Sequence, residues 1–265
     1  MKNTPWMMII TEGLLALMLL LSAFSPFEAP TVLDRETMER SNQMYENGRF
    51  HEAIQTYEQL VEKGIEDASL YYNLGNAHYK AGDLGRAILN YERARRLAPR
   101  EEDILANLEY SRSQTLDRYE SEANSPWKGW VHLASSYLTL DELSLLALGS
   151  FWTIAILIIA YKHSRSYRAR SVLQAGLIVV VLVFGLSAFT LGSRVYLESN
   201  SPSGIVVTNS VDILSGPGDD YITEFSLHAG AQVIIEETRG QWMRVALPGE
   251  QFQGWAPLET VERIG

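Results

Sequence analysis

The stretch "LYYNLGNAHYKAGDLGRAILNYERARRLAP", residues 70–99, contains two apolar patterns at helical spacing, and Gly82 and Asp83 separate them. Gly75 and Ala87 are small, which lets two antiparallel helices approach closely. The expected facing residues are Leu70, Leu74, Ala77 and Ala81 on the first helix and Ala87, Ile88, Tyr91 and Ala94 on the second. The stretch therefore predicts a helical hairpin.

The same pattern occurs 34 residues earlier in the chain (76 − 42 = 34). Seven residues recur at this offset: Asn42, Tyr45, Gly48, Ala53, Ile54, Tyr57 and Glu58 return as Asn76, Tyr79, Gly82, Ala87, Ile88, Tyr91 and Glu92. With Leu74, Gly75 and Pro99 in place, the repeat resembles the tetratricopeptide repeat family, which implies an all-α helical solenoid. An unrelated pair of helical hairpins is the alternative.

A third unit starts at "EEDILANLEYSRSQTLDRYE", where Leu105 and Leu108 keep the register but the later Gly, Ala and Tyr are missing. We interpret it as a capping helix, so that residues 34–122 form two repeats and a cap. Such arrays usually need about three stacked units for stability. We therefore expect a partner or the membrane to complete the solenoid.

The resemblance also implies a concave groove that binds extended peptides. The groove residues that it indicates are Met38, Asn42, Tyr45, Tyr72, Asn76, Tyr79 and Tyr110. Some members of the family grip a carboxylate, and Asn42 and Asn76 resemble part of that arrangement. Met38 and Tyr72 stand where it would place lysines, which argues against capture of a terminal carboxylate. A solvated groove without a dedicated ligand is the alternative.

Two long runs without charge follow in the second half of the chain. Residues 143–161 and residues 171–193 comprise 19 and 23 residues. At about 1.5 Å of rise per residue, each run can cross a hydrocarbon core of about 30 Å as a helix. The sequence therefore predicts two transmembrane α-helices and a bilayer as a partner.

The predicted loop between the spans, residues 162–170, is basic, although the chain as a whole has 22 Lys and Arg against 32 Asp and Glu. Its cations are Lys162, Arg165, Arg168 and Arg170. Short basic loops stay on the cytoplasmic side of a membrane. The regions on both sides of the hairpin are then extracytoplasmic, in a multi-pass protein of the bacterial cytoplasmic membrane. A plain polar turn is the alternative, and nucleic-acid binding by so short a patch is not expected.

The first residues, 1–29, combine Lys2, an apolar stretch and small polar residues, which is typical of a secretory signal peptide or a retained N-terminal anchor. The chain has no cysteine, so disulfides, thiol chemistry and lipoprotein attachment are excluded. Residues 126–142 carry Trp127, Trp130 and Tyr137 ahead of the first span. We expect an aromatic segment at the membrane interface there.

The last part of the chain, residues 204–264, alternates in short apolar strands with Gly and Pro at the turns. Through "VDILSGPG", "TRGQWMRVAL" and "GWAP" it resembles bacterial SH3-like domains, which implies a small all-β barrel. Such domains hold peptides or cell-wall fragments, and Tyr221 and Trp242 are the candidate ligand face. We expect Trp255 to pack in the core instead.

No catalytic or metal-binding pattern is found, and we expect neither an enzyme nor a cofactor. The stretch "HEAIQ" lacks the second His of a metalloprotease motif, and nucleophile-elbow, phosphate-loop and dinucleotide signatures are missing.

The complete order of segments, with "ANLEYSRSQTLDRYE" and "PWKGW", resembles the BatE-type proteins of the Bat (aerotolerance) group. That resemblance implies a membrane scaffold that acts beside von Willebrand factor A-domain membrane proteins and an AAA ATPase. The alternative is a cell-envelope sensor or tether whose SH3-like domain binds peptidoglycan.

Overall fold

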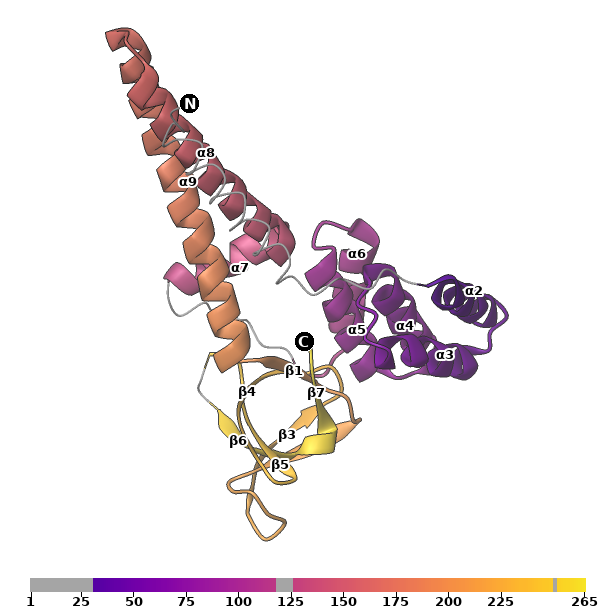
Figure 1. Ribbon diagram of the computed structural model, residues 1–265. Coiled ribbons are helices and arrows are strands. Elements are labelled where there is room, and N and C mark those ends of the chain that lie inside the picture. The colour runs from indigo at the N-terminus through magenta and orange to yellow at the C-terminus, as the bar shows by residue number, and fades with distance from the viewer. Residues whose placement is uncertain (1–30, 118–125, 250–251) are drawn as a thin grey trace.

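The structure is a computed structural model that describes residues 31–117, 126–249 and 252–265. In the part of the chain that the structure describes, the elements up to residue 200 are helices, and a β-sheet follows them (Figure 1). The segment expected to be a signal peptide or anchor, residues 1–29, lies outside the described residues. So do residues 118–122 at the end of the predicted capping unit.

Five helices form the predicted repeat region. They are α2 (Val32–Glu46), α3 (Phe50–Glu62), α4 (Ala68–Ala81), α5 (Leu84–Leu97) and α6 (Glu102–Ser113). Helices α2 and α3 pack as one hairpin, α4 and α5 pack as the next, and α6 lies against α5. The prediction of a helical repeat region is confirmed.

Short-range chemistry in residues 70–99 explains the second hairpin. The side chain of Asp83 accepts a hydrogen bond from the Arg86 amide and caps the start of α5, while Gly82 ends α4 in a left-handed conformation, at φ 86°. A Cβ atom on Gly75 would lie 2.8 Å from the ring of Tyr91, so only glycine allows this close approach of α4 and α5.

Helices α8 (Leu140–His163) and α9 (Tyr167–Asn200) run side by side as a long hairpin (Figure 1). Both are long and apolar enough, by length and composition, to cross a membrane. The bend between them is shorter than the predicted loop of residues 162–170, because Lys and Arg are good helix formers and both helices continue into the basic stretch. Helix α7 (Pro126–Tyr137) packs against α9, and Trp130 Nε1 donates a 3.1 Å hydrogen bond to Thr190 Oγ1.

The last part of the chain forms one antiparallel sheet of seven strands in the order β3-β2-β6-β5-β4-β1-β7. The strands are β1 (Ser203–Val206), β2 (Ser210–Leu214), β3 (Thr223–His228), β4 (Gln232–Arg239), β5 (Trp242–Ala246), β6 (Gln253–Pro257) and β7 (Val261–Arg263), with the 3₁₀ turn η1 (Leu258–Thr260) before the last. Among the described residues the edge strands β3 and β7 are not paired with each other. The sheet is thus not closed, and the small SH3-like barrel predicted from the sequence is not confirmed.

The sheet curls around an apolar core of its own. Its members alternate along the strands, as period-2 side-chain geometry requires. They include Val211 and Ile213 on β2, Val233 and Ile235 on β4, and Met243 and Val245 on β5. Trp255 on β6 is buried, at 8% exposure, in accordance with its expected packing in the core.

Helix α5 packs directly on the sheet, and the two units share a second apolar core. Ala87, Ile88 and Leu89 of α5 meet Ile205, Val207 and Ile264. The backbones approach so closely that a Cβ atom on Gly85 would lie 2.6 Å from the carbonyl oxygen of Val206. The element that covers the open side of the two repeats is therefore the chain's own C-terminal sheet.

Polar contacts surround this shared core. Arg86 Nε lies 3.2 Å from Glu262 Oε1, and the guanidinium of Arg93 donates to the backbone carbonyls of Arg263 and Ile264. On the other side, Asp117 accepts a 2.6 Å hydrogen bond from the backbone amide of His228. These bonds join the sheet to α5 and to the segment after α6.

Two further arginines join the repeat region to the long hairpin. Arg96 Nη2 lies 3.1 Å from Glu198 Oε2 of α9, and Arg100 Nη2 lies 2.5 Å from Glu142 Oε1 at the start of α8. Glu142 also closes the capping box that begins α8 with Thr139. The repeat region therefore contacts the ends of α8 and α9 that lie far from their bend.

Candidate functional site

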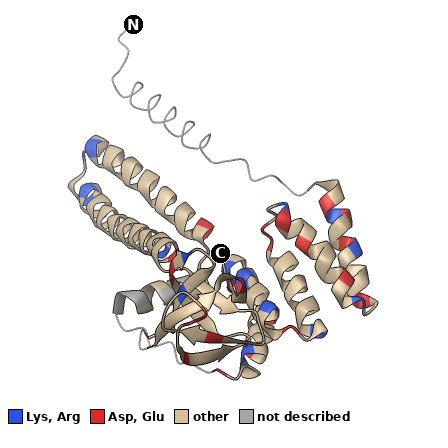
Figure 2. Ribbon diagram, turned by 90° about the horizontal axis from the view of Figure 1, so that it is seen from below, with Lys and Arg blue, Asp and Glu red and all other residues tan. Residues whose placement is uncertain are grey.

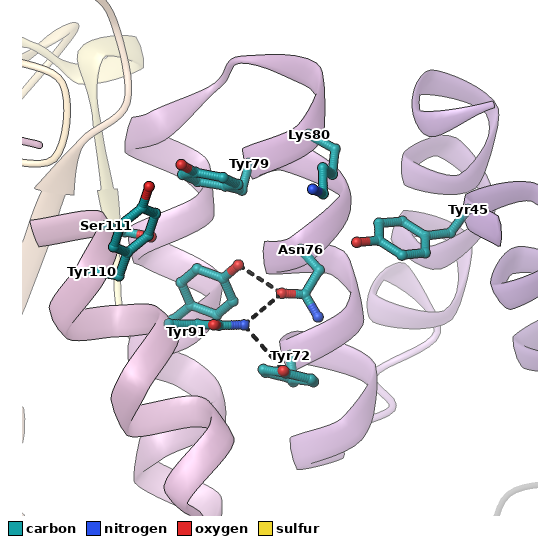
Figure 3. Close-up of a pocket in the computed structure, with 9 residues that line it drawn as sticks. Tyr45, Tyr72, Asn76, Tyr79, Lys80, Tyr91, Tyr110 and Ser111 are labelled. Atoms are coloured by element: carbon teal, nitrogen blue, oxygen red, sulfur yellow. Dashed lines mark hydrogen bonds between the residues drawn. The ribbon is translucent and has the colours of Figure 1, made fainter. Parts of the chain in front are cut away.

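The candidate site is a groove on the first-helix side of the repeats, with a volume of about 270 Å³. It lies between α2, α4 and α6, and α5 forms its floor (Figure 3). The residues that line it are Tyr45, Tyr72, Asn76, Tyr79, Lys80, Tyr91, Asn107, Tyr110 and Ser111. Five tyrosines in so small a space give the groove an aromatic, weakly charged surface.

A hydrogen-bond network centred on Asn76 holds the inner wall. Its Oδ1 atom accepts from the Tyr91 hydroxyl at 2.7 Å and from Asn107 Nδ2 at 3.0 Å. Asn107 Nδ2 also donates to the Tyr72 hydroxyl at 3.0 Å. Helices α4, α5 and α6 are thereby joined through one side chain, which preorganises this wall.

The rings of the groove are arranged in two tilted pairs. Tyr72 and Tyr91 have centroids 6.0 Å apart at 46°, and Tyr79 and Tyr110 have centroids 6.0 Å apart at 59°. Gln114 Nε2 donates a 2.9 Å hydrogen bond to the Tyr79 hydroxyl and fixes the second pair from outside. Tyr110 is 61% exposed, so its ring is available to a ligand.

Three polar groups on the α2 and α4 side have no hydrogen-bond partner among the described residues. They are the Tyr45 hydroxyl, Asn76 Nδ2 and Lys80 Nζ, and all three can donate. Figure 3 shows Tyr45 facing Asn76 and Lys80 across the space between the two helices. A ligand with hydrogen-bond acceptors can be held there.

The hydroxyls of Tyr91 and Tyr45 remain protonated at physiological pH. Burial raises the pKa of Tyr91, and neighbouring tyrosines add to the effect. Burial also raises the pKa of Tyr45, with a smaller contribution from Tyr72. Both groups are therefore neutral hydroxyls that can donate.

Five of the seven predicted groove residues line this groove together: Tyr45, Tyr72, Asn76, Tyr79 and Tyr110. The other two do not line it. Met38 is half-buried and packs against the core of the first repeat. Asn42 is engaged through its Oδ1 atom, which accepts from the Tyr57 hydroxyl at 2.5 Å and from Asn73 Nδ2 at 3.1 Å.

Four lining residues were not predicted from the sequence. Lys80 lies four residues after Asn76, so helical spacing could have placed it on the same face. Asn107 belongs to the incomplete third unit, but it lies 34 residues after Asn73 (107 − 73 = 34), so the repeat offset could have indicated it. Tyr91 was assigned to the helix interface, and Ser111 carries no sequence signal of its own.

The two residues predicted as the ligand face of the C-terminal sheet come from different elements. Tyr221 lies in the loop between β2 and β3, packs over Gly216 and is 50% exposed. Trp242 begins β5 and is half-buried. Strands β2 and β6 lie between β3 and β5 in the sheet, so the two aromatic residues belong to different parts of it.

The four predicted topology residues gather at the bend of the long hairpin (Figure 2). Lys162 lies in the last turn of α8, Arg165 in the bend, and Arg168 and Arg170 at the start of α9. The guanidinium of Arg170 donates to the Ser164 carbonyl and lies 5.6 Å from the ring centroid of Tyr161.

Within residues 31–117, 126–249 and 252–265, no group of three or more His, Cys, Asp or Glu side chains gathers that could hold a metal ion.

Comparison with known proteins agrees with the repeat geometry. The tetratricopeptide repeat family matches residues 44–102, from the end of α2 to the start of α6. No curated protein matches the sequence. Tetratricopeptide repeats generally mediate protein–protein interaction, and the matched residues include most of the groove lining.

Proposed function

We propose that the protein is a non-enzymatic, membrane-anchored adaptor that presents the repeat groove and the C-terminal sheet together on the extracytoplasmic side of the bacterial cytoplasmic membrane. One observation carries this proposal. The repeat region and the sheet pack on each other beside one end of the α8–α9 hairpin, while four cations gather at its other end.

The dimensions of the hairpin agree with a membrane span. At about 1.5 Å per residue, the 24 residues of α8 and the 34 residues of α9 extend for about 36 and 51 Å, beyond the hydrocarbon thickness of about 30 Å. The excess length of α9 leads to the sheet. Many of its apolar side chains, such as Ile178, Leu182 and Leu186, are exposed and suit contact with lipid.

The charge distribution supports one orientation. The bend carries Lys162, Arg165, Arg168 and Arg170, and positive charge in a short loop favours the cytoplasmic side. Because the repeat region and the sheet share an apolar core, both lie on the same side of any membrane that α8 and α9 cross. That side is the extracytoplasmic one.

The adaptor role follows from the groove, which is aromatic and preorganised and belongs to the matched repeat region. The order of segments resembles BatE-type proteins, so a von Willebrand factor A-domain membrane protein is the proposed partner in a Bat-type complex. The SH3-like character of the sheet belongs to the same proposal and rests on the strand motifs and their antiparallel order.

Recovery of partners from detergent-solubilised membranes tests the adaptor role. We expect the tagged full chain to recover a von Willebrand-type membrane protein, and the Tyr110→Ala chain to recover much less of it. Tyr71→Phe is the matched control, because Tyr71 lies on α4 but does not line the groove. If none of the three chains recovers a membrane protein, the proposal is contradicted.

A second candidate function is binding of peptidoglycan by the sheet. It is favoured by exposed aromatic residues, since Tyr221 is 50% exposed and Phe252, which packs edge-on against Phe225, is 56% exposed. Sedimentation of the full chain with purified cell wall tests it, with Tyr221→Ala and Phe252→Ala as variants. A chain that stays in the supernatant would exclude this function.

A further inference from the structure

The groove offers a ligand two different walls. On the α2 and α4 side stand three groups that can donate and have no partner among the described residues: the Tyr45 hydroxyl, Asn76 Nδ2 and Lys80 Nζ. On the α6 side stand the paired rings of Tyr79 and Tyr110. A ligand that fits both walls presents acceptors on one side and apolar rings or edges on the other.

The charge of the groove argues against an acidic ligand. Among the described residues that line it, Lys80 is the only charged one, and it is exposed to solvent. One hydrated lysine binds a carboxylate only weakly, because water and dissolved salt screen exposed ion pairs. The rest of the lining is tyrosine, asparagine and serine.

A proline-rich segment in the polyproline II conformation has the required chemistry. Proline has no N–H, and polyproline II has no internal hydrogen bonds, so its carbonyls remain open to donors. Its pyrrolidine rings pack well on aromatic faces, and its conformation is formed before binding, which lowers the entropic cost. Such a ligand needs donors and aromatic rings from its receptor and no matching acceptors.

We propose that the groove binds a proline-rich segment of a partner protein in the polyproline II conformation, an inference that rests on the proposed adaptor function. Tyr45, Asn76 and Lys80 donate to the carbonyls of the segment, and Tyr110 and Tyr79 pack against its rings. The Asn76 network keeps the inner wall fixed, so the groove reorganises little when it binds.

Fluorescence anisotropy with the full chain in detergent micelles tests the proposal. Three fluorescein-labelled probes of about ten residues are compared: oligoproline, oligoglutamate and a Gly-Ser peptide. We expect oligoproline to bind at least tenfold more tightly than the other two probes. Its affinity should change little with salt, because counterion release contributes little to binding in a groove with one cation.

Variants distinguish the groove from other surfaces. Tyr110→Ala removes an exposed ring and should weaken oligoproline binding about 5- to 20-fold. Tyr45→Phe removes one donor and should weaken it about 2- to 10-fold. Lys80→Gln keeps a donor without the charge and should change it less than about threefold. Tyr71→Phe should leave it unchanged, and an unaltered melting temperature verifies folding for each variant.

Several results overturn the inference. If oligoglutamate binds best and Lys80→Gln abolishes its binding, the ligand is acidic. If no probe binds, or if Tyr110→Ala leaves oligoproline binding intact, the groove does not recognise this conformation. In each of these cases the adaptor function is tested separately by the recovery experiment from detergent-solubilised membranes. It holds if the full chain recovers a partner protein and the Tyr110→Ala chain recovers much less of it.

Discussion

The hydroxyl of Tyr91 donates a 2.7 Å hydrogen bond to Oδ1 of Asn76, and Tyr57 makes the same bond, 2.5 Å long, to Asn42. Each bond joins the second helix of a repeat to its first helix. The two bonds are offset by 34 residues, the offset of the sequence repeat (91 − 57 = 34). The repeated Tyr and Asn residues therefore form the same interhelical hydrogen bond once in each repeat.

We expect Tyr91→Phe to destabilise the protein by about 1 kcal/mol, because the ring stays in place while one buried hydrogen bond is lost. Thermal melting monitored by circular dichroism should show a decrease of about 2–4 °C. Tyr57→Phe is the matched variant, with a similar loss of stability but no effect on the groove, which Tyr57 does not line. A Tyr91→Phe protein that melts like the parent would show that the bond contributes nothing.

Gly75→Ala should be more damaging, although alanine favours helices. Its Cβ atom would lie 2.8 Å from the ring of Tyr91, and overpacking of this kind costs about 1–3 kcal/mol. Gly149→Ala in α8 is the control, since nothing lies within 4 Å of its added Cβ atom. We expect the melting temperature to fall more for Gly75→Ala than for Gly149→Ala. An equal decrease for both variants would refute tight packing of α4 on α5.

Ile264→Asp tests the core shared by α5 and the sheet. Ile264 is buried there beside Ile88 and Val207. An unpaired carboxylate in this position costs several kcal/mol, so we expect the sheet to separate from α5. Hydrogen exchange should then show loss of amide protection in α5 as well as in β1. Faster exchange in β1 alone, with α5 still protected, would mean that the repeats fold without the sheet.

Asp83 predicts a dependence of stability on pH. Burial alone would raise its pKa, but contact with His78 and hydrogen bonds from the Arg86 amide and guanidinium lower it to about 2. A lowered folded-state pKa adds stability that is present above the unfolded value of 3.8 and is lost as the pH falls through 2.

Asp83→Asn keeps a helix cap without the charge, so we expect it to cost about 1–2 kcal/mol at pH 6 and progressively less towards pH 2. Melting temperatures across this range measure the effect. Asp67→Asn, at the equivalent cap of α4, removes a carboxylate bonded to the Leu70 amide only and controls for capping itself. If Asp83→Asn lowers the stability by the same amount at pH 6 and at pH 2, the lowered pKa of Asp83 is contradicted.

The local elements of the fold could be predicted from the sequence because their signals are local. Helical spacing, Gly82 and the cap at Asp83 define α4 and α5, and the uncharged runs define α8 and α9. Strand β3 lies outside the motifs "VDILSGPG", "TRGQWMRVAL" and "GWAP" that indicated strands in this part of the sequence. Its sequence "TEFSLH" places mainly polar residues on an edge strand, where only one neighbour contributes pairing and the apolar alternation is weak.

The packing of the sheet on α5 could not be predicted, since it joins residues as distant as Arg86 and Glu262. From their spacing, Ile88 and Tyr91 were expected to pack between the two helices of a repeat. The sequence around Val207 and Ile264 does not indicate that a helix packs against them. The sequence led us to expect a partner or the membrane to complete the short solenoid. The chain's own C-terminal sheet packs there instead.

The groove was predictable where the repeat is regular. Tyr45, Asn76 and Tyr79 occupy repeat positions that face the first-helix side, and they line the groove. Asn42 occupies the position equivalent to Asn76 but lies outside the lining. Asn42 nevertheless accepts the same two kinds of hydrogen bond as Asn76, because Asn73 is the counterpart of Asn107 (107 − 73 = 34). The neighbouring position differs, since Tyr72 lines the groove and its equivalent Met38 packs against the core of the first repeat.

The central claim is that the repeat region and the sheet lie together on one face of a membrane, opposite the basic bend. The chain has no cysteine, so single cysteines at Glu109, Ser166 and Glu224 can be labelled in intact cells with a membrane-impermeant maleimide. All three positions are exposed, in α6, the bend and β3. We predict labelling of Glu109→Cys and Glu224→Cys in intact cells and of Ser166→Cys only after permeabilisation. Labelling of Ser166→Cys in intact cells, or of only one of the other two, would contradict the claim.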